Sequence, residues 1–246
     1  MPSEMLQQVL PTLPFGRMAL FLDVDGTLLY IAPTPESVVV PEGLPDLLVQ
    51  LHRSTGGALA LVSGRPIIDL DRLFSPVRLP AAGQHGAEWR LDPNDLLQRV
   101  TLLPDALRHQ CVALAEAHPG VLAEDKGGAV ALHVRARPDL TEEIAEALAS
   151  IVASFPDYEV LGGKAVFEVR RRGVHKGAAV ATLLNFPPFV GRTPVFVGDD
   201  TTDLDAIELV NARHGHGLLV APTGPLCCPM DVRRWLASLL SREPGG

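Results

Sequence analysis

Short apolar runs alternate with helical patterns along most of the chain, and this alternation constrains the fold more than any other feature. Four apolar runs have the length of single strands, at residues 18–24, 58–62, 194–200 and 217–221. Helical patterns follow or separate them at residues 42–53, 175–186, 202–212 and 231–242. Strands that alternate with helices form βα units around a parallel sheet. The sequence therefore predicts an α/β fold built on a doubly wound, mostly parallel sheet.

A different pattern interrupts this sheet in the middle of the chain. Two helical stretches, 104–117 and 139–154, are each followed by a pair of apolar strands around a Gly-Gly dipeptide. Strand pairs joined by short glycine turns make antiparallel hairpins, and we expect the second turn at Gly162–Gly163. The predicted organisation is a Rossmann-like core, residues 1–93 and 174–246, with an inserted α-β-β-α-β-β cap (lid) domain at residues 94–173.

The bulk composition excludes several classes of function. The 246 residues carry a formal net charge of −8 and no basic run, so the chain as a whole lacks the positive charge that attracts nucleic acid. No apolar run approaches the roughly 18 residues that a membrane span needs, and the N-terminus lacks the pattern of a signal peptide. Three cysteines, an odd count, favour a reducing compartment over a disulfide framework. We expect a cytoplasmic protein. The sequence does not reveal the oligomeric state, for which we expect a monomer.

Acidic residues follow two of the predicted strands. Asp23 and Asp25 end the first apolar run two residues apart, so a strand-like backbone points them to the same side. A second cluster, GDDTTD at residues 198–203, follows a strand in the second half of the core. Ligands of open α/β sheets bind beyond the carboxyl ends of the strands, where the two clusters would converge. Carboxylate oxygens there suit Mg²⁺ that bridges to a substrate phosphate.

DVDGT also permits an interpretation as a calcium loop or as a plain turn. The calcium-loop pattern places its glycine after a third ligand position, whereas Gly26 comes too early and is followed by Thr and Leu. That pattern is not met. The second acidic cluster at a matching strand end favours a functional site over a plain turn.

Two further groups would complete a phosphoryl-transfer site. Ser63, Gly64 and Arg65 follow the second strand, where a hydroxyl and the next backbone N–H groups could hold a phosphate at a helix N-terminus. Lys176 starts a helix after the insert, where its charge would offset that of the phosphate and of a nucleophile. Isolated serines and lysines are usually solvated surface residues, but the shared position at strand ends favours the functional interpretation.

His214 and His216, two residues apart in RHGHG, are another candidate for a metal site. No carboxylate or cysteine with metal spacing accompanies them. We therefore expect these histidines in a loop near the rim of the phosphoryl-transfer site.

Together these segments resemble the haloacid dehalogenase-like phosphotransferase superfamily, whose four motifs occur in order as DVDGT, Ser63, Lys176 and GDDTTD. Over almost the whole chain the resemblance extends to the trehalose-6-phosphate phosphatase family. It rests on FLDVDGTL with the following PTPE, on ALVSGRP and AAGQHGAEWR, and on AEDKGGAVALHVR and GGKAVFEVRRRGVHKGAA. Where that family usually continues GDDxTD with Glu and, three residues later, Phe, this chain has Leu204 and Ile207.

The resemblance implies a mechanism in two steps with a residue for each role. Asp23 would be the nucleophile that forms an aspartyl-phosphate. Asp25 would protonate the leaving sugar oxygen and then act as the base that activates water. Mg²⁺ would be bound by Asp23, the main-chain oxygen of Asp25, and Asp199. Around these ligands would lie Asp200 and Asp203, with Ser63 and Lys176 on the phosphoryl oxygens.

The resemblance also implies which residues bind the substrate, a small-molecule sugar phosphate. Polar residues of the cap would recognise the sugar, with Glu124, Lys126 and Glu168 at the matching positions. Charged groups on hairpins are often solvated rim residues, so this assignment depends on the resemblance. Further candidates for substrate contact are Thr27, Gly64, Arg65, His85 and Lys164.

Alternatives to hydrolysis of trehalose 6-phosphate remain open at this stage. The same site could serve another sugar phosphate, such as sucrose 6-phosphate or mannosyl-3-phosphoglycerate. A sugar phosphomutase would need a cluster of arginines in the cap for a second phosphate, and none is evident. A regulatory protein that accepts phosphate on an aspartate shares the acidic cluster, the hydroxyl residue and the lysine, but such domains are shorter and carry no lid.

Overall fold

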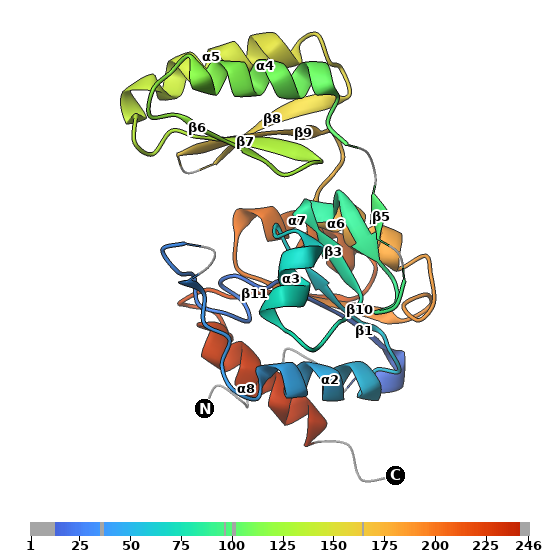
Figure 1. The fold of residues 1–246 in the computed structure, drawn as a ribbon. Helices are drawn as coiled ribbons and strands as arrows, with labels where there is room; N and C mark the ends of the chain where they lie inside the picture. Colours follow the sequence, from blue (N-terminus) through green and yellow to red (C-terminus); the bar gives the residue numbers. More distant parts are fainter. Residues whose placement is uncertain (1–12, 35–36, 96, 100–101, 164, 242–246) are drawn as a thin grey trace. The chain divides into compact units, whose positions relative to one another are not determined.

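The structure is a computed structural model of the chain and describes residues 13–34, 37–95, 97–99, 102–163 and 165–241. It divides into two compact units. The first combines the residues up to Gln98 with those from His175 onward, and the second is Arg99–Val174. Each unit has its own sheet (Figure 1). Each also has its own apolar core.

A seven-stranded sheet in the order β11-β10-β1-β2-β3-β4-β5 forms the centre of the first unit. Its strands are β1 (Met18–Leu22), β2 (Leu59–Val62), β3 (Ala81–Gly83), β4 (Glu88–Arg90), β5 (Gln98–Arg99), β10 (Thr193–Gly198) and β11 (His216–Leu219). Strand β1 pairs in parallel with β2 and β10, β2 pairs in parallel with β3, and β10 with β11, whereas β3 and β4 are antiparallel. The predicted mostly parallel α/β fold is confirmed, and β1 lies inside the sheet between two parallel neighbours.

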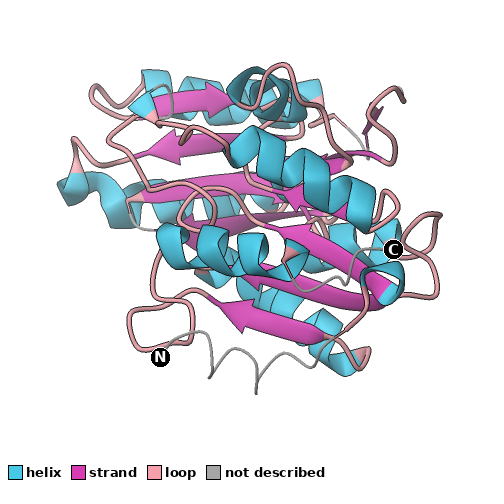
Figure 2. Cartoon of the chain, turned by 90° about the horizontal axis from the view of Figure 1, so that it is seen from below, coloured by secondary structure: helices cyan, strands magenta, loops and turns pink. Residues whose placement is uncertain are grey.

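Helices cover both faces of this sheet, which explains why its strands are apolar on both faces. They are α2 (Leu44–Ser54), α3 (Ile67–Leu73), α6 (Lys176–Leu183), α7 (Leu204–Ala212) and α8 (Pro229–Leu240). Leu20 and Leu22 of β1 share a core with residues of α2 and α8, and Phe21, which points to the other face, shares one with residues of α6 and α7. Figure 2 shows helices on both sides of the strands. Each fully buried leucine contributes about 1.5–3 kcal/mol to stability.

The second unit is a four-stranded antiparallel sheet in the order β6-β7-β9-β8. Its elements are α4 (Asp105–Glu116), β6 (Leu122–Asp125), β7 (Ala129–His133), α5 (Thr141–Val152), β8 (Tyr158–Gly163) and β9 (Val166–Arg171). Leu107 of α4 and Leu148 of α5 pack in one core with Val130 and Val169 of the sheet. The observed order of elements is the α-β-β-α-β-β that the sequence predicts.

Short 3-10 turns complete the described elements: η1 (Phe15–Arg17), η3 (Gln84–Gly86), η4 (Pro138–Leu140) and η5 (Thr201–Asp203). Within the described ranges, no helix combines the length and the apolar character that crossing a membrane requires.

Two local predictions differ from the structure. The second hairpin turn is not at Gly162–Gly163, because β8 continues through both glycines and Gly163 pairs with Val166. His216 begins β11 beside Val195, at the end of the parallel strands opposite to the acidic clusters. The expectation that the two histidines lie near the site is therefore wrong.

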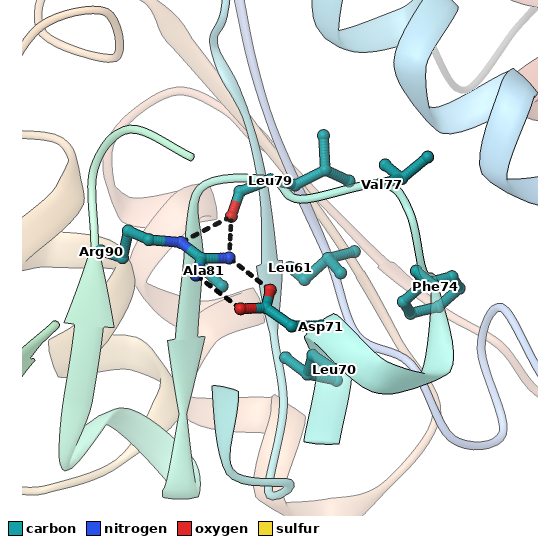
Figure 3. A pocket seen from close by; sticks show the side chains of 8 residues that line it. All are labelled: Leu61, Leu70, Asp71, Phe74, Val77, Leu79, Ala81 and Arg90. Carbon is teal, nitrogen blue, oxygen red and sulfur yellow. Dashed lines mark hydrogen bonds and ion pairs between the residues drawn. The ribbon is translucent and has the colours of Figure 1, made fainter. Parts of the chain in front are cut away.

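A buried ion pair anchors the antiparallel strand β4, an element that the sequence analysis did not predict. The Arg90 guanidinium donates to both Asp71 oxygens, at 2.8 and 2.6 Å, and to the backbone oxygen of Leu79 at 2.9 Å. Figure 3 shows this pair, which joins β4 to α3, beside a small apolar cavity. Burial disfavours the Asp71 carboxylate, but the hydrogen bonds and charge of Arg90 outweigh it and lower the pKa of Asp71. The pair fixes the segment that leads from α3 through β3 to β4.

Candidate active site

Neighbouring parallel strands bring the predicted acidic residues together. Asp23 follows β1, Ser63 follows β2 and Asp199 follows β10, and β1 lies between the other two strands. The carboxyl ends of parallel strands meet at one edge of a sheet, which is where ligands of open α/β folds bind. Lys176, the first residue of α6, is bound to Asp23 at the same edge.

Lys176 lies between two buried carboxylates. Its ammonium donates to Asp23 Oδ1 at 2.7 Å and to Asp203 Oδ1 at 2.6 Å, and all three side chains are at most 5% exposed. Burial disfavours the ammonium, but the two carboxylates outweigh this effect and raise the pKa of Lys176. The sequence assigned Lys176 to phosphoryl oxygens; in the structure it holds Asp23 in place and offsets its charge.

The Asp23 side chain is buried. Its backbone N–H donates to Val197 O at 2.9 Å, so the residue continues the pairing of β1 with β10. Burial raises the pKa of the Asp23 carboxyl to about 7, although Lys176 opposes this shift. Without a bound cation, Asp23 therefore carries a proton in part of the molecules near neutral pH.

Asp199 explains the glycine and the threonine of DVDGT. Gly26 has a φ of +86°, and its open side faces the Asp199 carboxylate so closely that a Cβ atom would overlap it. The fully buried Thr27 donates its hydroxyl to Asp199 Oδ1 at 3.2 Å. Burial is the largest influence on Asp199 and raises its pKa, against the Thr27 hydrogen bond. Thr27, predicted as a substrate contact, instead orients the Asp199 carboxylate.

Asp203 holds the turn of the second acidic cluster through hydrogen bonds to its backbone. Its Oδ2 accepts hydrogen bonds from the backbone N–H groups of Asp199 at 3.1 Å and Asp200 at 3.0 Å, while Oδ1 accepts from Lys176. Asp200 caps η5 and accepts from the Thr201 N–H at 2.6 Å. Because Asp203 is fully buried, its carboxylate contacts the turn that carries Asp199 and is not exposed to solvent.

These carboxylates have the chemistry of a site for a hard divalent cation. One carboxylate oxygen from each of Asp23, Asp199 and Asp203 lies within 4.8 Å of the others. Oxygen ligands at the edge of a sheet suit Mg²⁺, which keeps positions for water and phosphate. Because Asp203 already accepts three hydrogen bonds, Asp23 and Asp199 are the carboxylates best placed to bind the ion.

Asp25 has a partner that the sequence analysis did not predict. The Arg65 guanidinium donates from Nε to Asp25 Oδ2 at 2.6 Å and from Nη2 to Oδ1 at 2.8 Å. The sequence analysis listed Arg65 as a candidate for substrate contact, whereas in the structure it pairs with Asp25. The available signal was an arginine three residues after the end of β2, the strand beside β1.

The segment after Ser63 offers less to a phosphate than its sequence indicates. Helix α3 begins only at Ile67, whose N–H donates to the buried carboxylate of Glu88 at 2.6 Å. The N–H of Arg65 donates to Ser63 Oγ at 3.1 Å. The anion at the start of α3 is thus the protein's own Glu88, a residue that the sequence analysis did not single out. The first N–H of α3 is therefore already paired, and the binding of phosphate by the Ser63 hydroxyl and the Gly64 N–H stays a prediction.

His85 and Gly64 lie against each other beside this segment. A Cβ atom on Gly64 would lie 2.7 Å from His85 Nε2, so only glycine fits without moving the ring. Gln84 and His85 both have positive φ values, 49° and 55°. Non-glycine residues in this conformation cost free energy and often occur at functional sites.

The predicted sugar-binding residues belong to the sheet of the second unit. Glu124 and Glu168 pair in register with Ala131 from its two sides. Lys126 Nζ donates to Glu168 Oε2 at 3.0 Å, and His133 Nε2 lies 3.0 Å from Glu124 Oε2. The structure thus brings Glu124 and Glu168 onto one sheet, and Lys126, which follows β6, into contact with Glu168. Lys164 lies outside the described residues.

Comparison with known proteins defines the family. A family model described as trehalose-phosphatase matches residues 21–224, a span that holds both acidic clusters, Ser63 and Lys176. The chain belongs to the trehalose-phosphatase family. A probable trehalose-phosphate phosphatase of Sinorhizobium fredii is 43% identical over 228 residues, which cover 92% of this chain and 83% of that protein. The trehalose-6-phosphate phosphatase of Escherichia coli is 41% identical over 231 residues, which cover 90% of this chain and 86% of its own.

Solved structures agree with this family at the level of the fold. The C-terminal domain of the Candida albicans trehalose-6-phosphate phosphatase superimposes with a TM-score of 0.75 at 22% identity, covering 97% of this chain and 96% of that one. A phosphatase of the haloalkanoate enzyme superfamily from Bacteroides thetaiotaomicron has a TM-score of 0.60 at 14% identity, covering 91% and 94%. The resemblance drawn from the sequence is confirmed.

Leu204 and Ile207, the two departures from the usual trehalose-phosphatase pattern, both lie on α7. Leu204 is exposed at the start of α7. Ile207 packs against the core beneath α6 and α7, and its backbone and side chain leave room only for a glycine at Gly217 of β11. Ile207 therefore contributes to the packing of α7 against β11, whereas the exposed Leu204 does not.

Proposed function

We propose that this protein hydrolyses trehalose 6-phosphate to trehalose and phosphate, with Mg²⁺ and through an aspartyl-phosphate on Asp23. The observation that carries the proposal is the set Asp23, Lys176 and Asp199 at the carboxyl end of β1 and β10. The names of the bacterial relatives support the substrate. A carboxylate beside a buried ammonium is suited to accept a phosphoryl group.

In the first step, Asp23 attacks the phosphorus atom. A new bond forms between a carboxylate oxygen and phosphorus as the bond from phosphorus to the sugar oxygen breaks. Lys176 fixes the direction of the carboxylate and lessens its repulsion of the anionic phosphate. Asp25 transfers a proton to the departing sugar oxygen, so that trehalose leaves as a neutral alcohol.

In the second step, Asp25 takes a proton from a water molecule as that water attacks the aspartyl-phosphate. The bond between Asp23 and phosphorus breaks, phosphate is released, and the Asp23 carboxylate is restored. Asp25 regains the proton that it gave away, which a group acting first as acid and then as base must do.

A divalent cation fits the donor set. Asp23 and Asp199 would hold Mg²⁺ together with the main-chain oxygen of Asp25, and Thr27 and Asp203 keep Asp199 in position. When bound, the cation would supply positive charge that lets a carboxylate approach a phosphate and stabilises charge in the transition state.

We also propose that Glu124, Lys126 and Glu168 of the second unit contact the sugar. They form a compact polar group in which the Lys126 ammonium is already oriented by Glu168. Such groups give a sugar several donors and acceptors in fixed directions. Variants that remove these side chains should raise KM for the sugar ester more than for small phosphate esters.

Phosphate release from a panel of esters tests the proposal. Trehalose 6-phosphate, sucrose 6-phosphate and mannosyl-3-phosphoglycerate are compared with and without Mg²⁺, and Asp23→Asn serves as the inactive reference. We expect trehalose 6-phosphate to be hydrolysed fastest of the three esters. We expect hydrolysis only when Mg²⁺ is present. Preference for another ester would overturn the substrate. A stable phosphorylated Asp23 without turnover would instead indicate a regulatory protein.

A further inference from the structure

Asp25 is held by Arg65 in a two-point contact. Both carboxylate oxygens accept from the guanidinium, at 2.6 and 2.8 Å, and the side chains are 32% and 15% exposed. Two parallel charge-assisted bonds fix the orientation of a carboxylate as well as its position. The neighbouring helix α3 carries a looser pair, Arg72 with Asp69, in which one bond of 3.2 Å joins exposed side chains.

The backbone of Arg65 is itself fixed by the adjacent turn. Its carbonyl accepts from the Gln84 N–H at 3.0 Å, and the Ser63 carbonyl accepts from the His85 N–H at 3.0 Å. Gln84 and His85, which donate these two bonds, both adopt the left-handed conformation. The imidazole of His85 covers Gly64 from the side. Strain of this kind persists only where surrounding contacts hold it, so the turn η3 gives Arg65 a rigid base.

We propose that Arg65 is a positioning residue, which orients the Asp25 carboxylate for proton transfer at the leaving oxygen and does not bind the phosphate itself. The inference rests on the proposed function, because Asp25 has this role only in a phosphate-ester hydrolase. It replaces the assignment of Arg65 to the substrate that the sequence suggested.

Proton transfer is the step that such positioning serves. A general acid must bring its oxygen within hydrogen-bond distance of the atom that it protonates. Asp25 lies beyond the last residue of β1, where the sheet no longer orients its side chain. The guanidinium can only donate, so one of the two bonds opens when Asp25 carries the proton. The other bond keeps the side chain in place through the cycle.

Three variants of the full chain test the role of Arg65 in the presence of Mg²⁺. Arg65→Met removes the contact, Arg65→Lys keeps the charge without the fork, and Arg72→Met removes the surface pair as a matched control. For trehalose 6-phosphate, kcat of Arg65→Met should fall about 10–100-fold, as for other residues that orient a reacting group. KM and the inhibition constant of inorganic phosphate should change less than about threefold, because ground-state binding is retained. Arg65→Lys should remain slow and Arg72→Met should match the wild type.

A substrate whose leaving group needs no proton distinguishes the two possible roles of Arg65, positioning of Asp25 and binding of the phosphate. p-Nitrophenolate departs without a proton, so Arg65→Met should keep a rapid burst of nitrophenolate from p-nitrophenyl phosphate while steady turnover falls. In an Asp25→Asn background, Arg65→Met should have no further effect, since the residue acts through Asp25. A crystal structure of Arg65→Met should show the Asp25 side chain displaced from its present position.

Other outcomes overturn the inference. Arg65 would be shown to bind the phosphate by either of two results. One is that inorganic phosphate binds about tenfold more weakly to Arg65→Met than to the wild type. The other is that adding Arg65→Met to Asp25→Asn slows the enzyme further. Full activity of Arg65→Lys would show that charge alone suffices. A wild-type chain that hydrolyses no phosphate ester contradicts the proposed function, whereas an active wild type with an equally active Arg65→Met contradicts only the role of Arg65.

Discussion

The carboxylate of Asp199 fills the space into which any side chain at Gly26 would project. Gly26 belongs to the turn after β1 and Asp199 to the turn after β10, two neighbouring parallel strands. The close approach allows Thr27, the next residue, to donate its hydroxyl to the same carboxylate. The glycine in DVDGT is therefore required by a contact between two segments that are far apart in the sequence, as well as by its positive φ.

Gly26→Ala should abolish Mg²⁺-dependent hydrolysis while the chain still folds, because a Cβ atom must displace Asp199. Gly43→Ala is the matched control, since Gly43 also has a positive φ, +79°, but no atom of the described residues lies within 4 Å of its missing side chain. Both variants should lose about 1–2 kcal/mol of stability from the backbone conformation. Thermal unfolding and activity are measured together, and equal activity in the two alanine variants would contradict the prediction.

Lys176→Met should destabilise the protein by about 3–5 kcal/mol, the usual cost of leaving a buried charge without its partner. The loss should grow with pH. Removing the ammonium raises the pKa of Asp23 further above its unfolded value, so folding is favoured at low pH and loses stability as pH rises and the carboxyl ionises.

Urea unfolding at about pH 5.5 and about pH 8 measures this dependence. The double variant Lys176→Met/Asp203→Asn should recover part of the lost stability, because one uncompensated carboxylate is removed with the lysine. An equal loss at both pH values would contradict the role of Lys176 as the counter-charge of Asp23.

Mg²⁺ should bind more tightly as pH rises towards neutrality and should release protons below it. The pKa of Asp23 is about 7 in the metal-free fold, so at lower pH the cation must displace a proton from this carboxyl. Affinity should increase by up to about tenfold per pH unit below 7. Calorimetric titrations in buffers with different ionisation enthalpies measure the protons released, and a pH-independent affinity would show that Asp23 is not a ligand.

Arg90→Met should cost about 3–5 kcal/mol of stability, because it leaves Asp71 partly buried without its two-point partner. Arg78→Met removes the other arginine bound to the same carboxylate, at 3.2 Å and far more exposed, and should cost less than about 1 kcal/mol. The Arg90 pair lowers the pKa of Asp71, so its contribution is present at neutral pH and is lost as pH falls through that lowered pKa. This prediction would be contradicted if Arg90→Met and Arg78→Met unfolded at the same denaturant concentration.

The local sequence predicted where the main helices and strands that position the candidate active site lie in the chain. Asp23 and Asp199 could be predicted as neighbours because each follows an apolar strand, and parallel strands place their carboxyl ends on one side. Lys176 could be placed at the start of a helix from the periodicity after it. The small strands β3 and β4 were missed, because three-residue segments such as Ala81–Gly83 carry no alternation that predicts a strand.

The sequence by itself determined which chemical groups gather at this edge and the class of fold that gathers them, since both follow from strand and helix periods. Only the tertiary structure decided which group pairs with which. Arg65 contacts Asp25, Lys176 joins Asp23 to Asp203, and Glu88 takes the start of α3. Each of these pairings joins segments that are separate in the chain, so it depends on distances of a few ångströms between folded strands. Residue order alone does not contain those distances.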